Sequence, residues 1–272
     1  MAHDPAEHLA GALAIGAVSY LNSRPLTEPL VSLARGARIV FDLPSRLADA
    51  LAAGVLDVAL VPSIEYFSHA GWTIVSDACV ACDGPVRSVK LFGRVPVEAV
   101  RTLALDEGSR TSSALVRILL LERFGLEPKI ERLPIGASLA DTAADAVLVI
   151  GDRAMRMASG EFEFVWDLGQ QWSEWMGLPF VFAMWIARPN VPLAGLAELL
   201  AAARDDGLRR VEQIARREAP LLEIPVEDCL AYLRDHLTFR LGPREREGLE
   251  RFGRLAARHQ LVPRGARLAF AD

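Results

Sequence analysis

Short runs of apolar residues alternate along the chain with segments in which apolar positions recur every three or four residues. The short runs are typical of strands, and the periodic segments are typical of amphipathic helices. In the first part of the chain, this pattern predicts strands at residues 12–18, 38–41 and 58–61 and helices at 25–34 and 44–53. The strand at 58–61 is apolar on both faces, as expected for a strand inside a parallel sheet.

A second series with the same alternation begins after residue 95. It predicts strands at 102–105, 129–132, 146–150 and 180–187 and helices at 112–124 and 151–158. The rest of the chain is predicted to be helical, because apolar residues follow a 3.6-residue period at 196–214 and 249–256. Alternating strands and helices predict an α/β fold with a largely parallel sheet.

No flexible linker joins the two series, since no Gly/Ser-rich or low-complexity segment separates them. We therefore expect two lobes connected by extended crossings, outward at 88–95 and back at 180–187. Lobe one is then discontinuous and comprises residues 12–92 and 184–272, and lobe two comprises 93–183. A ligand cleft is expected between the lobes, because open α/β sheets bind ligands at the carboxyl ends of their strands.

Composition and charge narrow the class of protein. The 272 residues are 51% hydrophobic and carry a net charge of −5, which fits a globular chain with a substantial core. The sequence has no basic stripe typical of a nucleic-acid binder and no run of about 18 or more apolar residues for a membrane span. The apolar segment near the start follows acidic rather than basic residues, unlike a signal peptide, so we expect a cytoplasmic protein.

The three cysteines, Cys79, Cys82 and Cys229, are too few and too scattered for a disulfide framework. Cys79 and Cys82 have C-x-x-C spacing, but no second pair or histidine cluster accompanies them. We interpret both as core thiols, with redox or metal chemistry as the alternative. The sequence also has no dinucleotide fingerprint, phosphate-binding loop or hydrolase elbow. We expect the protein to need neither a metal nor a cofactor.

Residues 106–113 combine hydroxyls, a glycine and an arginine in the turn between a predicted strand and a helix. Backbone N–H groups at a helix N-terminus and an arginine both attract anions. The segment therefore predicts a carboxylate-binding site formed by Ser109, Arg110, Thr111 and Ser112. The alternative is an ordinary helix cap, although the hydroxyls are more numerous than one cap requires.

Three further polar segments lie near predicted strand ends. Ser19 and Asn22 follow the first strand, and Gly151 and Asp152 follow the strand predicted at 146–150. We expect Ser19, Gly151 and Asp152 to contribute to substrate binding. Ser88 lies between two basic residues at the outward crossing. For Asn22 and Asp152, the alternative is that each side chain only caps the helix that follows.

These segments resemble motifs of the chorismate dehydratase family of the futalosine route to menaquinone. The resemblance runs from about residue 13 to 260 and includes six segments in the same order. They are VSYLNSRPL at 18–26, VPSIEY at 61–66, VRSV at 86–89, residues 105–112, IGD at 150–152 and GLPFVFA at 177–183. The chain has Ser23 where the family commonly has alanine.

The resemblance implies a two-lobed, type II periplasmic-binding-protein fold and the dehydration of chorismate to 3-[(1-carboxyvinyl)oxy]benzoate. It implies Asn22 and Ser88 as the catalytic residues, and it implies that Ser109, Thr111 and Ser112 hold a carboxylate. The expected partner is the small molecule chorismate, with no nucleic acid and no membrane. The oligomeric state stays open between monomer and homodimer.

Two other functions fit the same scaffold. A small-carboxylate solute-binding protein would share the fold, but such proteins are normally exported. The sister enzyme that makes 1,4-dihydroxy-6-naphthoate relies on a histidine base. None of the five histidines of this chain lies in a candidate segment.

Overall fold

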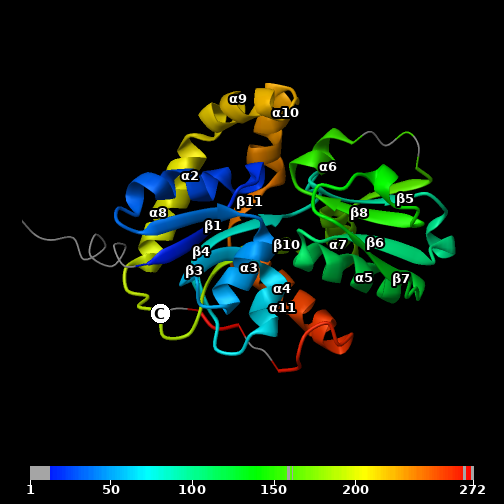
Figure 1. Cartoon of the computed structure of the whole chain (residues 1–272), viewed down its shortest axis with the longest axis horizontal. Coiled ribbons are helices and arrows are strands. Elements are labelled where there is room, and N and C mark those ends of the chain that lie inside the picture. The colour runs from blue at the N-terminus through cyan, green and yellow to red at the C-terminus, as the bar shows by residue number, and fades with distance from the viewer. Residues whose placement is uncertain (1–12, 158–159, 161, 266–267, 271–272) are drawn as a thin grey trace, which may run out of the picture.

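The computed structural model describes residues 13–157, 160, 162–265 and 268–270. They form two β-sheets that lie beside one another along the long axis of the molecule, each with its own helices (Figure 1). Residue 12, the first of the predicted strand 12–18, and residue 158, the last of the predicted helix 151–158, lie outside the described ranges. Residues 266–267 and 271–272 of predicted lobe one also lie outside them. None of the helices in the described part of the chain has both the length and the apolar character needed to cross a membrane.

The first sheet has the strand order β11-β4-β10-β3-β1-β2. Its strands are β1 (Ala14–Val18), β2 (Arg38–Asp42), β3 (Val58–Pro62), β4 (Thr73–Cys82), β10 (Phe180–Ala187) and β11 (Thr238–Arg240). β1 runs parallel to β2 and β3, whereas β10 is antiparallel to β3 and β4, and β11 is antiparallel to β4. The helices packed against these strands include α2 (Arg24–Leu33), α3 (Pro44–Ala52), α4 (Ser63–Ser68), α8 (Leu196–Arg209) and α11 (Pro243–Arg258).

The second sheet has the strand order β7-β6-β8-β5-β9. Its strands are β5 (Val89–Gly93), β6 (Thr102–Asp106), β7 (Lys129–Leu133), β8 (Ala146–Ile150) and β9 (Phe164–Asp167). β6 runs parallel to β7 and β8, whereas β5 is antiparallel to β8 and β9. The helices of this sheet are α5 (Arg110–Phe124), α6 (Asp152–Arg156) and α7 (Leu168–Met176).

The prediction of a largely parallel sheet is wrong, because both sheets are mixed. The antiparallel pairs involve the strands next to the crossings, β5 and β10, except for the pair of β11 with β4. The partners of both strands lie far from them in the chain, so the local alternation of strands and helices does not fix the direction of β5 and β10. The predicted crossings at 88–95 and 180–187 are wrong in position, because these residues form β5 of the second sheet and β10 of the first. The chain passes between the sheets just before them, at residues 83–88 and 177–179. The lobe boundaries at 92/93 and 183/184 stay a prediction.

The C-terminal part is helical, as the periodicity predicts, with α9 (Val211–Leu221) and α10 (Val226–Ala231) following α8. A π-helical segment, η4 (Tyr232–His236), then leads into β11, and the periodicity predicted neither of them. A strand of three residues is too short to produce a readable alternation. Single-turn 3₁₀ helices occur at η1 (Leu21–Ser23), η2 (Val97–Ala99) and η3 (Leu139–Asp141).

The core confirms the interpretation of the C-x-x-C pair. Cys79 and Cys82 lie on β4 with free, fully buried thiols, and burial raises the pKa of each. A thiol that keeps its proton is a weak nucleophile. Within the described ranges, no group of three or more His, Cys, Asp or Glu side chains is arranged to hold a metal ion.

Candidate active site

A cavity lies between the two sheets, where the carboxyl ends of β1, β3 and β8 and the N-terminus of α5 meet. The structure brings six of the predicted site residues to this cavity: Asn22, Ser88, Ser109, Thr111, Ser112 and Gly151. Ser19, Arg110 and Asp152 are not among its lining residues. The remaining wall is largely apolar, and no charged side chain of the described chain lines it. Binding in this cavity therefore depends on hydroxyl, amide and backbone groups.

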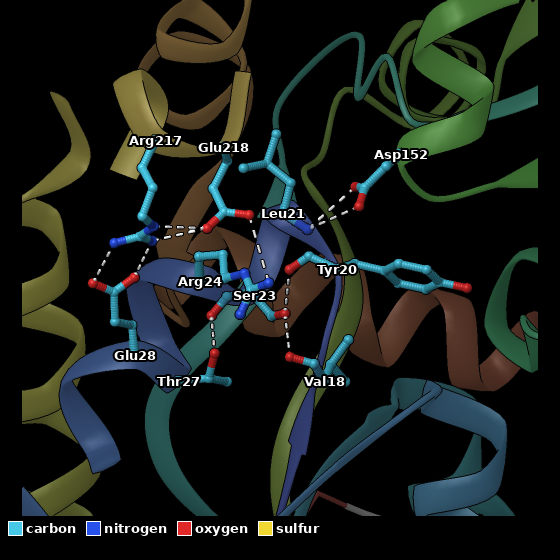
Figure 2. A network of polar contacts seen from close by, with 10 residues as sticks. All are labelled: Val18, Tyr20, Leu21, Ser23, Arg24, Thr27, Glu28, Asp152, Arg217 and Glu218. Atoms are coloured by element: carbon cyan, nitrogen blue, oxygen red, sulfur yellow. Dashed lines mark hydrogen bonds and ion pairs between the residues drawn. The ribbon is translucent and has the colours of Figure 1, made fainter. Parts of the chain in front are cut away.

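The turn after β1 presents Asn22 to the cavity. The fully buried Ser23 hydroxyl lies 2.8 Å from the carbonyl oxygen of Val18 and 2.7 Å from that of Tyr20 (Figure 2). Thr27 donates a hydrogen bond of 3.1 Å to the Ser23 carbonyl oxygen. These contacts hold η1 in one conformation, so Asn22 has a defined place at the cavity wall.

Asn22 does not cap the helix that follows it. The N-cap residue of η1 is Tyr20 and that of α2 is Ser23. The Asn22 side chain makes no hydrogen bond to any part of the chain that the structure describes. The capping alternative is therefore wrong, and the Asn22 amide is available to a ligand.

Ion pairs fix α2, and with it η1, to α9. Arg217 pairs with Glu28 of α2, with an N···O distance of 2.5 Å, and with Glu218 at 2.9 Å (Figure 2). Glu218 in turn lies 3.5 Å from Arg24, the first residue of α2. This network anchors the turn from the side opposite the second sheet.

Ser88 is held in place by three neighbouring segments. Its carbonyl oxygen accepts a hydrogen bond from the Gly151 N–H at 2.8 Å, and its hydroxyl accepts one from Tyr232 at 2.8 Å. The Asp167 carboxylate accepts hydrogen bonds from the N–H groups of residues 86 and 87. Arg87 has a φ of 62°, which a non-glycine residue adopts only where its surroundings enforce it. The Ser88 position is thus rigidly defined.

The N-terminus of α5 is partly a helix cap and partly a contact between the sheets. The Ser109 hydroxyl accepts a hydrogen bond from the Ser112 N–H at 3.3 Å, as the capping alternative predicted for this residue. The Thr111 hydroxyl instead accepts one from the Ile64 N–H of α4 at 3.2 Å. All three hydroxyl residues, Ser109, Thr111 and Ser112, line the cavity. Their role in holding a carboxylate stays a prediction.

Arg110 is engaged elsewhere. Its guanidinium lies 3.1 Å from Glu65 and 2.6 Å from Asp49, and it does not line the cavity. Arg110 is adjacent in the sequence to the hydroxyl residues that line the cavity. Successive side chains at a helix N-terminus point in different directions, so the Arg110 side chain points away from them. Arg110 is occupied by ion pairs with α4 and α3.

Asp152 bonds to the other sheet rather than capping its own helix. Its carboxylate oxygens accept hydrogen bonds from the Leu21 N–H at 3.2 and 3.3 Å (Figure 2). The N-cap of α6 is Gly151, and no side chain caps this helix. Burial raises the pKa of Asp152 to about 6, against the lowering effect of the Leu21 N–H and of Arg24. The Asp152 carboxylate therefore connects the second sheet to η1 of the first.

Tyr20 makes a second contact between the sheets. Gly151 has a φ of +74°, and a Cβ atom there would lie 3.0 Å from the Tyr20 ring. Burial raises the pKa of Tyr20 to about 12, with the charges of Asp106 and Asp152 adding to the effect. Tyr20 lies inside the motif at 18–26, but nothing in the sequence indicated its contact with Gly151.

Sequence reasoning also missed Tyr232 and Asp167, which both support the Ser88 turn. Tyr232 lies 144 residues from Ser88 in the chain. No local pattern connects the two, so only the folded chain reveals the contact.

Comparison with known proteins identifies relatives in sequence. A family model described as menaquinone biosynthesis matches residues 13–258. Chorismate dehydratase of Thermus thermophilus is 34% identical over 229 residues, which cover 77% of this chain and 83% of that protein.

Solved structures share the fold. Protein AF1704 of Archaeoglobus fulgidus has a TM-score of 0.70 at 13% identity and covers 92% of this chain and 98% of its own. The periplasmic aliphatic sulphonate binding protein of Escherichia coli has a TM-score of 0.62 at 17% identity and covers 96% of each chain. The predicted two-lobed, periplasmic-binding-protein-like fold is confirmed. The sequence match establishes more than the fold: this chain belongs to the menaquinone-biosynthesis family that includes chorismate dehydratase.

Proposed function

We propose that this chain dehydrates chorismate to 3-[(1-carboxyvinyl)oxy]benzoate, an early step of menaquinone biosynthesis. Its membership of the family and its 34% identity to a chorismate dehydratase support this activity. The observation that carries the proposal is the cavity between the sheets, where Asn22 and Ser88 come together with the hydroxyls of the α5 N-terminus.

The chemistry suits a site without a strong base. The ring proton at C3 of chorismate is acidic, because its loss delocalises charge into the C1 carboxylate. Cleavage of the bond between C4 and its hydroxyl oxygen then makes the ring aromatic, and the oxygen leaves with the removed proton as water. The protein has mainly to orient the substrate and to stabilise the departing hydroxyl by hydrogen bonds.

We propose the enolpyruvyl carboxylate of the substrate as the base. The polar side chains that line the cavity are hydroxyls, one amide and one phenol, which bind and orient a carboxylate but do not compete with it as a base. The Asn22 amide orients this carboxylate, and the Ser88 hydroxyl donates a hydrogen bond to the leaving oxygen.

Chorismate carries two carboxylates, and a cavity without lining charges must stabilise them in another way. The N-terminus of α5 provides backbone N–H groups, one of which the Ser109 hydroxyl caps, and the positive end of a 15-residue helix. Ser109, Thr111 and Ser112 add hydroxyls at the same place. We assign the binding of one carboxylate to this helix N-terminus.

The direct test is incubation of the purified chain with chorismate, followed by absorbance and mass spectrometry. We expect an aromatic product that is lighter than chorismate by one water. Calorimetry with chorismate on the same preparation distinguishes the alternatives. Binding without turnover would indicate a solute-binding protein, and absence of both would contradict the proposal.

A further inference from the structure

The hydroxyl of Ser88 is in contact with a tyrosine from the far end of the chain. The Tyr232 phenol donates a hydrogen bond to the Ser88 hydroxyl oxygen at 2.8 Å, and both side chains are fully buried. Tyr232 is the first residue of the π-helical segment η4. Such segments are rare and occur frequently at functional sites. The contact is therefore a candidate for a role beyond packing.

The hydrogen bonds of Ser88 leave its own proton unused by the protein. A serine hydroxyl has one proton to donate and two lone pairs to accept with. Tyr232 occupies one lone pair, while the Ser88 backbone groups bond to Val86 and Gly151. In the described part of the chain, no acceptor takes the Ser88 hydroxyl proton, and Ser88 lines the cavity. A ligand in the cavity is the acceptor that this arrangement fits.

The Tyr232 phenol stays protonated in its hydrogen bond to Ser88. Burial raises the pKa of the Tyr232 phenol far above its ordinary value, and the nearby charges of Asp152 and Asp167 add to this effect, against a lowering by the Ser88 hydrogen bond. Tyr232 therefore keeps the proton that it places in the hydrogen bond to Ser88. Because successive hydrogen bonds polarise one another, a phenol that donates to Ser88 makes the serine a stronger donor.

We propose that Tyr232 is a positioning residue that orients the Ser88 hydroxyl as a hydrogen-bond donor to the hydroxyl that the substrate loses. This inference rests on the proposed function, since it assigns a role within the same site. Tyr232 does not touch the substrate, and no proton moves through it. Its effect is to hold the Ser88 oxygen in place and to leave the serine proton pointing at the leaving group.

Tyr232→Phe removes the donor and keeps the ring. We expect kcat to fall by about tenfold or more, with KM changed much less, because Ser88 acts on the leaving group as the bond breaks. The matched control is Tyr66→Phe. The buried Tyr66 hydroxyl accepts a hydrogen bond from the Ala269 N–H at 2.6 Å and does not line the cavity. The control should lose stability and keep the wild-type kcat.

A double-mutant cycle separates positioning from general stabilisation of the fold. If Tyr232 acts through Ser88, Tyr232→Phe should lower kcat in the wild-type background and have almost no further effect in the Ser88→Ala background. An equal loss in both backgrounds, or a wild-type kcat for Tyr232→Phe, would overturn the proposal.

A second measurement serves if Tyr232→Phe does not fold. The chain has three tyrosines, one of which, Tyr20, lines the cavity, so 3-fluorotyrosine is incorporated at position 232 alone, where it makes the phenol a stronger donor without removing it. The proposal predicts that fluorination changes kcat only when Ser88 is present, and equal ratios with and without Ser88→Ala would contradict it. An inactive wild-type chain would remove the proposed function and this inference together. An active wild type with an unaffected Tyr232→Phe would remove only the role of Tyr232.

Discussion

Asn22 lines the cavity and makes no hydrogen bond to the described part of the protein. Asn22→Ala should therefore lower kcat by roughly 10²–10³ through loss of a preorganised donor. The free energy of unfolding should change by less than about 0.5 kcal/mol, because no hydrogen bond within the described part of the protein is lost. Steady-state kinetics and urea unfolding on one preparation measure both quantities.

Ser88→Ala provides the contrast to Asn22→Ala. It should lower kcat to a similar extent, but it also leaves the buried Tyr232 hydroxyl without its acceptor, at a cost of about 1–3 kcal/mol in stability. Ser32→Ala, on the outer part of α2, serves as the control, since its hydroxyl bonds only to the Pro29 carbonyl. A fully active Asn22→Ala enzyme would remove Asn22 from the mechanism.

The Thr111 hydroxyl accepts a hydrogen bond from the Ile64 N–H, and Thr111 also lines the cavity. If its hydroxyl also binds a substrate carboxylate, Thr111→Val should raise KM by about tenfold or more with little change in kcat, since a charge-assisted hydrogen bond contributes about 1.5–3 kcal/mol. The Ile64 N–H also loses its partner, so the variant should be less stable. Thr102→Val, at the opposite end of β6, loses a hydroxyl contact to Asp145 and should keep its KM. An unchanged KM for Thr111→Val would leave this hydroxyl with a structural role only.

At the scale of elements, the contact of η1 with the turn after β8 depends on a glycine. Gly151→Ala combines two costs: a backbone φ of +74° and a Cβ atom 3.0 Å from the Tyr20 ring. We expect a loss of stability of about 1–3 kcal/mol and a lower kcat, because displacement of Tyr20 shifts the neighbouring Asn22.

A second glycine separates the two costs. Gly54 has a φ of +73°, but a Cβ atom there would meet nothing within 4 Å. Gly54→Ala should therefore show only the backbone cost, about 1 kcal/mol, with a normal kcat. Equal kcat values for the two alanine variants would show that the contact between Tyr20 and Gly151 has no influence on catalysis.

At the scale of the whole molecule, the hydrogen bond between Asp152 and the Leu21 N–H joins the two sheets. Burial raises the pKa of this carboxyl from 3.8 to about 6. A raised pKa favours the protonated form in the folded state. The resulting contribution to stability is fully present below about pH 4 and is lost as the pH rises through about 6.

Asp152→Asn isolates this contribution. The difference in unfolding free energy between wild type and Asp152→Asn should fall as the pH rises from about 4 to about 7, because the variant lacks the titrating group. Denaturant unfolding at several pH values measures it. Subtracting the two unfolding free energies cancels the contributions of the other carboxyl groups. Several of these have a lowered pKa, so their contribution to stability rises with pH. Parallel stability curves for the two proteins would contradict the assignment of the shifted pKa to Asp152.

The amino-acid sequence by itself determined most of the strands and helices in the two alternating series, although α4, β4, β9 and α7 were not predicted. β3 and β8 are continuous apolar runs, and α8 and α11 have apolar residues at a helical period. Both patterns involve residues close together in the chain, so the sequence alone reveals them. The polar residues that follow β1 and β8 could be assigned to a cleft between the two sheets, because open α/β sheets bind ligands at the carboxyl ends of their strands.

The tertiary structure alone decided how these segments combine. The direction of β5 and β10, the ion pairs that occupy Arg110, the bond between Asp152 and Leu21 and the support of Ser88 by Tyr232 all depend on contacts between segments far apart in the chain. Such contacts leave no period in the sequence, because the free energy that selects them comes from packing and hydrogen bonds formed only when the whole chain has folded.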